Sequence, residues 1–179
     1  MKILIINGSP HTDGTTALLR DKFAEGAADA GHSITTFHAC KEELHPCIGC
    51  DRCRTTEDGC IYKDGMEKLN PLLLDADCVV FATPLYYFGM SAQIKMVIDR
   101  FYANNTTLRS QKKKAVLLAA CGDTDSVTLD ALYQHYQAVC GYLHWEDAGS
   151  VQAIGMYTRP DIEKSSYPEA ARALGQSLA

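Results

Sequence analysis

The chain has 179 residues, of which 46% are hydrophobic and 22% charged, and its formal net charge is −5 at pH 7. This length is enough for one domain with an apolar core. The mild negative charge argues against nucleic acid or an anionic membrane surface as a main partner, and we expect neither.

The expected cellular compartment decides how the cysteines are interpreted. No run approaches the ~18 consecutive apolar residues of a membrane-spanning helix, and no basic-then-apolar leader precedes the first strand. We therefore expect a cytoplasmic protein. Because disulfides are rare in that reducing compartment, the clustering among the eight cysteines indicates metal or redox chemistry.

Strand-like and helix-like runs alternate along the chain. Apolar runs predict strands at residues 3–6, 78–82 and 115–120, and we also expect a short strand at 33–37 and a fifth strand within 144–154. Apolar side chains at helical spacing predict helices at residues 15–30, 94–101, 129–140 and 167–178. Another helix is expected to open at Asp64, which with Glu67 resembles a capping box. Pro71 either kinks this helix or begins a second one.

Five strands that alternate with five helices indicate an α/β fold, a doubly wound parallel sheet buried on both faces. We expect one domain over residues 1–179, with an irregular cysteine-rich loop at residues 45–63. In such folds ligands bind at the carboxyl ends of the strands. The turns after the first, third and fourth strands are therefore the candidate sites.

The turn after the first strand, NGSPHTDGTT at residues 7–16, combines glycines with hydroxyl side chains. It leads into a helix, whose amino end presents unpaired N–H groups and a partial positive charge. A phosphate can rest there without many cationic side chains. The turn is neither a Walker loop nor GxGxxG, and a merely structural polar turn with a helix cap is the alternative. The candidate phosphate residues are Ser9, Pro10, His11, Gly14, Thr15 and Thr16.

The other two turns complete a site for a flat phosphorylated ring. TPLYYFG at residues 83–89 places three aromatic rings after the third strand, and CGD at residues 121–123 forms a compact polar turn after the fourth. Exposed rings are costly unless something flat or a second subunit covers them. The candidate residues are Pro84, Leu85, Tyr86, Tyr87, Phe88, Gly89, Cys121, Gly122 and Asp123.

The pattern GSPxxxGxT followed by TPLYYFGMSAQIKMVIDRF resembles the flavodoxin-like NADPH-dependent FMN reductases over residues 1 to about 125. The resemblance implies a flavodoxin-like three-layer sandwich with strand order 2-1-3-4-5, and FMN as cofactor with NAD(P)H as electron donor. It also implies roles for the candidate residues. Ser9, Thr15 and Thr16 would hold the phosphate with His11 nearby, residues 84–89 would line the isoalloxazine, and residues 121–123 would approach its pyrimidine edge. Relatives often have Gly-Asn-Thr where this chain has Gly-Thr-Thr. Since the flavin does the electron chemistry, we name no catalytic acid or base.

A second candidate site is the cysteine-rich segment PCIGCDRCRTTEDGC at residues 46–60. Its two-residue gaps suit thiolates that wrap a small inorganic core, and it resembles the motif of the iron–sulfur flavoproteins. That resemblance implies a [4Fe–4S] cluster that passes single electrons to FMN. Zinc, a disulfide and bare thiols are the alternatives. The candidate ligands are Cys47, Cys50, Cys53 and Cys60.

The expected function is an FMN-dependent NAD(P)H oxidoreductase that reduces a flavin, a quinone or another small acceptor. An iron–sulfur flavoprotein that carries electrons between ferredoxin-like partners is the alternative, and a non-enzymatic zinc-stiffened module is a third class. The electron acceptor is a small molecule or a protein. We expect a homodimer or larger homo-oligomer, with contacts at Tyr87, Phe88 and the cysteine loop.

Overall fold

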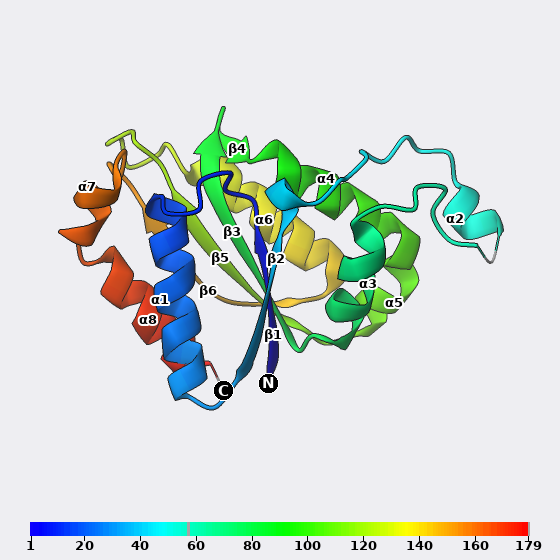
Figure 1. The fold of residues 1–179 in the computed structure, drawn as a ribbon, viewed down its shortest axis with the longest axis horizontal. Helices are drawn as coiled ribbons and strands as arrows, with labels where there is room; N and C mark the ends of the chain where they lie inside the picture. The colour runs from blue at the N-terminus through cyan, green and yellow to red at the C-terminus, as the bar shows by residue number, and fades with distance from the viewer. Residues whose placement is uncertain (57, 179) are drawn as a thin grey trace.

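The computed structural model describes residues 1–56 and 58–178, and a parallel sheet runs through its centre (Figure 1). The neighbouring strands follow the order β2-β1-β3-β5-β6. This architecture confirms the predicted α/β fold. The five parallel strands are β1 (Lys2–Asn7), β2 (Ser33–His38), β3 (Cys78–Tyr86), β5 (Lys114–Ala120) and β6 (Glu146–Ala153).

The sheet differs from the predicted order 2-1-3-4-5 by one added strand. A two-residue strand, β4 (Gly89–Met90), pairs antiparallel with the last residues of β3. The sequence analysis took this stretch as a loop. The parallel strands on either side keep the predicted sequence of neighbours, so the carboxyl ends of β1, β3 and β5 lie next to one another at one edge.

Helices cover both faces of the sheet (Figure 1). One face carries α1 (Thr15–Asp29), α7 (Arg159–Glu163) and α8 (Tyr167–Ser177). The other carries α3 (Met66–Asp75), α4 (Ala92–Arg100), α5 (Asn105–Ser110) and α6 (Asp130–Leu143). Short helical turns lie at η1 (Ala39–Lys41), α2 (Arg52–Thr55) and η2 (Phe101–Asn104). In the part of the chain that the structure describes, no helix is long and apolar enough to cross a membrane.

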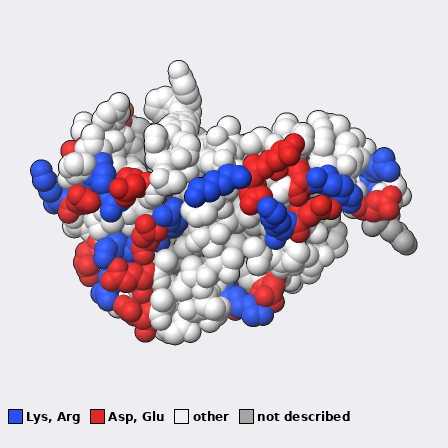
Figure 2. All heavy atoms as spheres, viewed as in Figure 1, with Lys and Arg blue, Asp and Glu red and all other residues white. Residues whose placement is uncertain are grey.

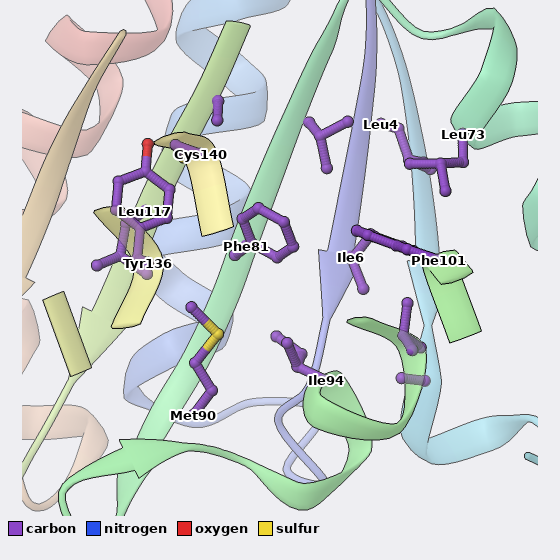
Figure 3. Packing of buried hydrophobic residues seen from close by; sticks show 14 of the residues in the cluster. Leu4, Ile6, Leu73, Phe81, Met90, Ile94, Phe101, Leu117, Tyr136 and Cys140 are labelled. Carbon is purple, nitrogen blue, oxygen red and sulfur yellow. The ribbon is translucent and has the colours of Figure 1, made fainter. Parts of the chain in front are cut away.

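The core divides into two layers because successive strand side chains point to opposite faces. In β1, Ile3 and Ile5 pack toward α1 and α8, whereas Leu4 and Ile6 pack toward α3 and α4. Figure 3 shows Phe81 in the middle of the second layer. Burial on both faces explains why β1, β3 and β5 consist mainly of consecutive apolar residues.

The start of α3 is where the sequence-based prediction of a helix cap fails. Pro71 lies inside one continuous helix, and Gly65 stands at its amino end without a side-chain cap among the described residues. The predicted capping box does not form. Asp64 accepts a hydrogen bond from the Met66 N–H at 3.1 Å, but its carboxylate mainly binds elsewhere, as described below. Glu67 lies at the surface, 3.9 Å from Lys63.

Glycine allows α1 and α8 to pack closely, and this contact can be tested. A Cβ at Gly175 would lie 2.3 Å from the Phe23 carbonyl oxygen, so Gly175→Ala must push the two helices apart. We expect a loss of about 1–3 kcal/mol in the free energy of unfolding. Gly141→Ala in α6 is the control, because no described atom lies within 4 Å of the added methyl. That change should raise stability by up to about 1 kcal/mol. Equal effects of both substitutions in urea unfolding would contradict the close contact.

Candidate functional site

A hollow of about 710 Å³ lies at the carboxyl ends of β1, β3 and β5. Its volume falls in the range of small-molecule sites. The structure brings residues of all three predicted turns to this one hollow. The predicted residues that line it are Ser9, His11, Gly14, Thr15, Thr16, Pro84, Leu85, Tyr86, Cys121 and Gly122, and those that do not are Pro10, Tyr87, Phe88, Gly89 and Asp123.

The amino end of α1 forms one wall of the hollow. The helix begins at Thr15 after Gly14, and no side chain of the described residues caps it. Thr15 and Thr16 are therefore the first two residues of the helix, and neither one caps it. Its first turn also contains no acidic residue. Because the first N–H groups of a helix have no partner within the helix, this end offers donors and partial positive charge to an anion.

The segment just before α1 is held by its own hydrogen bonds. The hydroxyl of Ser9 accepts from the His11 N–H at 3.3 Å and lies 3.4 Å from the His11 carbonyl oxygen. Gly8 packs against the start of α4, where a Cβ would lie 2.4 Å from the Ser91 hydroxyl oxygen. Internal hydrogen bonds and the close contact with the start of α4 thus hold this turn in place.

The β3–β4 hairpin forms the second wall. Tyr87 and Phe88 have φ angles of 47° and 63°, which matches a two-residue turn of the type that normally requires glycine or asparagine. Such backbone strain in bulky residues is a recognised mark of functional segments. Tyr86 lines the hollow, whereas Tyr87 is fully exposed and Phe88 is 61% exposed. Figure 2 shows uncharged atoms projecting at the position of this hairpin.

The third wall comes from the turn after β5 and from a segment that the sequence analysis missed. Gly122 lies against Tyr157, and a Cβ there would be 2.7 Å from the Tyr157 ring. Asp123 is exposed, and its carboxylate accepts from the Asp125 N–H at 3.1 Å and the Thr128 hydroxyl at 3.0 Å. These hydrogen bonds lower the pKa of Asp123, and its side chain stabilises the turn.

Three further lining residues, Met156, Tyr157 and Arg159, follow β6. The same rule that selected the turns after the other strands would have found them, because β6 is also a parallel strand. The less regular pattern around Gly149 obscured its end. Thr12, Asp13 and Ala120 also line the hollow and lie within or beside the predicted turns.

The cysteine loop lies far from α7 along the longest axis of the molecule (Figure 1). All four candidate cysteines line one hollow of about 20 Å³, together with Tyr62 and Tyr102. Burial and the charges of the other three cysteines raise the pKa of Cys53. Within the described residues, however, no three His, Cys, Asp or Glu side chains are close enough to hold a metal ion. The thiols are therefore gathered but not arranged as a ligand shell.

A buried ion pair fastens both ends of this loop to α4. The side chains of Asp64 and Arg100 are 1% and 3% exposed, and Arg100 Nη1 lies 2.8 Å from Asp64 Oδ2. Arg100 also donates to the carbonyl oxygens of His45 at 2.8 Å and Tyr62 at 3.4 Å. His45 stacks on Tyr62 with ring centroids 4.5 Å apart. We call Asp64, Arg100, His45 and Tyr62 the clasp.

The charge state of the clasp follows from its hydrogen bonds. Burial by itself would raise the pKa of Asp64, but the Arg100 guanidinium and the N–H groups of His45 and Met66 bring it down to about 2. For Arg100, burial by itself would lower the pKa. The hydrogen bond and the charge of Asp64 outweigh burial, so the pKa of Arg100 is raised. A smaller contribution in the same direction comes from Cys60.

A parallel sheet of this strand order, with an uncapped helix end and an aromatic hairpin at one edge, is typical of the flavodoxin-like class. The sequence profile of Flavodoxin_2, described as a flavodoxin-like fold, matches residues 1–178. The chain belongs to this family, which confirms the resemblance inferred from the motifs.

Individual relatives carry both names that the motifs suggested. Over 100 residues the chain is 35% identical to an iron–sulfur flavoprotein of Methanocaldococcus jannaschii, which covers 56% of this chain and 51% of that protein. It is 28% identical over 171 residues to an NAD(P)H-dependent FMN-containing oxidoreductase, so named, of Bacillus subtilis, with 89% and 87% covered. The chain thus spans about half the length of the iron–sulfur flavoprotein it matches.

A solved structure agrees over the whole fold. The NAD(P)H:quinone oxidoreductase from Methanothermobacter marburgensis superposes with a TM-score of 0.71 over 99% of this chain and 96% of that one. Sequence identity is 16%, so this likeness concerns the fold alone.

The clasp predicts a large effect of a small substitution. Asp64→Asn keeps the shape of the side chain but leaves Arg100 buried without its counter-charge, which should cost about 3–5 kcal/mol in the free energy of unfolding. Asp99→Asn is the control, since Asp99 pairs with Lys95 at 2.6 Å on the surface and should contribute less than about 0.5 kcal/mol. Urea unfolding of both variants measures the difference.

The same carboxylate predicts a pH dependence. Its pKa of about 2 lies below the ordinary 3.8, so the ionised form is favoured in the folded state. That contribution to stability is fully present above pH 3.8 and is lost as the pH falls through about 2. It amounts to roughly 2 kcal/mol. Wild type should lose this stability in acid and Asp64→Asn should lack the step; parallel curves for the two proteins would contradict the assignment.

Proposed function

We propose that the protein is an FMN-dependent NAD(P)H oxidoreductase. One observation carries the proposal: the uncapped amino end of α1, the aromatic hairpin and the turn after β5 border a single hollow. The residues present fit FMN, because helix donors and hydroxyls suit its phosphate and flat apolar walls suit its ring. The Bacillus subtilis relative, named for FMN and NAD(P)H over most of its length, supports the same reading.

The residues of the hollow would bind and orient rather than react. Bound FMN supplies the hydride and electron chemistry. The N–H groups at the start of α1, with Ser9, Thr15 and Thr16, would hold the phosphate. Pro84, Leu85 and Tyr86 would line the ring, and Gly122 lets Tyr157 close the wall against it. Cys121 is buried and its pKa is raised by that burial, which disfavours a reactive thiolate.

The hairpin at the edge of the hollow also bears on the electron acceptor and on the assembly. A quinone or another small oxidised ring suits a site open beside an aromatic hairpin, and the quinone reductase neighbour has the same fold. The fully exposed Tyr87 and the neighbouring Phe88 would be covered by a second copy of the chain, which supports a homodimer or larger homo-oligomer. The cytoplasmic location stays a prediction from the sequence.

Removal of one hydroxyl tests the phosphate site. Thr15→Val keeps the side-chain shape and deletes a donor that lines the hollow, so the dissociation constant for FMN should rise about tenfold. Thr106→Val on the exposed surface of α5 is the matched control and should bind as wild type does. Fluorescence quenching of FMN by the apoprotein gives the affinities. An apoprotein that ignores added FMN and does not oxidise NADH or NADPH would end the proposal.

A second candidate function adds an iron–sulfur cluster. The four cysteines that line one hollow favour it, since they match a [4Fe–4S] cluster in number and type of donor. The loop would have to draw the thiols closer than they now lie. The protein would then carry electrons between ferredoxin-like partners and FMN.

Metal analysis of single-cysteine variants separates the two functions. After anaerobic purification, wild type should contain about four iron and four sulfide per chain if the second candidate holds, and Cys50→Ser should lose them while it keeps FMN. Cys40→Ser, outside the loop, is the control and should keep both. Zinc in place of iron, or no metal in any of the three proteins, would exclude the cluster and leave the first function in place.

A further inference from the structure

The turn at residues 7–16, which we call the phosphate turn, carries no lysine or arginine of its own, yet an arginine lies beside it. Residues 7–16 contain neither residue type. Arg159 lines the same hollow as Gly14, Thr15 and Thr16, and α7 lies beside the amino end of α1 (Figure 1). The fold thus brings a fixed positive charge to the turn from a position 146 residues further along the chain.

Two carboxylates hold the guanidinium through different nitrogens. Arg159 Nε donates to Glu163 Oε1 at 2.8 Å, and Nη1 pairs with Asp13 of the phosphate turn. The Arg159 side chain is 28% exposed, whereas that of Asp13 is 83% exposed. Glu163 lies one helical turn away on α7 and fixes the direction of the guanidinium.

We propose that Arg159 is the counter-cation of the flavin phosphate and that Asp13 competes with the phosphate for it. The inference rests on the proposed function. Asp13 lies within the turn and can leave Arg159 at little cost, because its carboxylate is mostly solvated. The pair with Glu163 uses only Nε, so the N–H groups of Nη1 become available to a second anion once Asp13 leaves.

Arg159 would increase the preference for FMN over riboflavin beyond what the helix N–H groups provide by themselves. A phosphate at the amino end of α1 gains about half a unit of positive charge from the helix, and Arg159 adds a full one. A flavin without the phosphate would gain nothing from Arg159. The arginine therefore selects FMN over riboflavin and leaves the ring site unchanged.

The test compares two ligands that differ only in the phosphate. Apoprotein is titrated with FMN and with riboflavin, and flavin fluorescence reports each dissociation constant. Arg159→Gln should weaken FMN binding about tenfold and leave riboflavin binding unchanged. Asp13→Asn should tighten FMN binding by about threefold, again without effect on riboflavin, since it removes the competing anion. The matched control is Arg172→Gln, whose side chain pairs with Glu25 and Asp29 on α1, and both affinities should stay as in wild type.

Salt gives an independent readout that a structural role would not move. Wild-type affinity for FMN should fall as potassium chloride rises, and Arg159→Gln should show a shallower slope. Equal loss of FMN and riboflavin affinity in Arg159→Gln would make the residue a shape determinant and overturn the inference. Unchanged or weaker FMN binding in Asp13→Asn would overturn the competition. If wild type binds neither flavin, the proposed function fails as well, and that result is distinct from normal FMN binding by Arg159→Gln, which overturns the inference alone.

Discussion

Parallel pairing of β3 between β1 and β5 decides where the functional residues lie. Asn7 at the end of β1 is aligned with Ala82, and Pro84 near the end of β3 is aligned with Ala120. Because the three strands point the same way, their following turns reach one edge together. The phosphate turn, the aromatic hairpin and the turn after β5 are far apart in sequence, and only this register makes them walls of one hollow.

Features that depend on neighbouring residues could be predicted from the sequence, and features that depend on distant ones could not. The turn at residues 7–16 could be predicted because glycines and hydroxyl residues come directly after a run of strand-forming residues. That pattern is local in the sequence. Asp64 was misread because a capping box and a buried ion pair use the same carboxylate, and its partner Arg100 lies 36 residues away. Arg159 escaped notice because its partner Asp13 lies 146 residues earlier in the sequence.

The β3–β4 hairpin was missed for a different reason. Two-residue hairpin turns are recognised by glycine or asparagine at the positions with positive φ, and here those positions hold Tyr87 and Phe88. The hairpin is instead fixed at its base, where the Ser91 N–H donates to the Thr83 hydroxyl at 3.0 Å. Tertiary contacts impose a backbone that the local residues disfavour, and they do so where two large rings are held out from the body.

Helix α4 connects the two candidate centres physically. It begins under the hairpin, where the Ser91 hydroxyl accepts from the Ile94 N–H and packs against Gly8 of the phosphate turn. It ends at Arg100, which holds both ends of the cysteine loop. A nine-residue helix is about 13 Å long and stiff, so a loop fastened to one end keeps a fixed separation from a ring held at the other. Were the loop to hold a cluster, the buried pair of Arg100 with Asp64 would keep both ends of that loop fastened to the end of α4. In a chain of net negative charge, Arg159 lines the hollow together with residues of the phosphate turn, so the fold places a cation where an anionic group would bind.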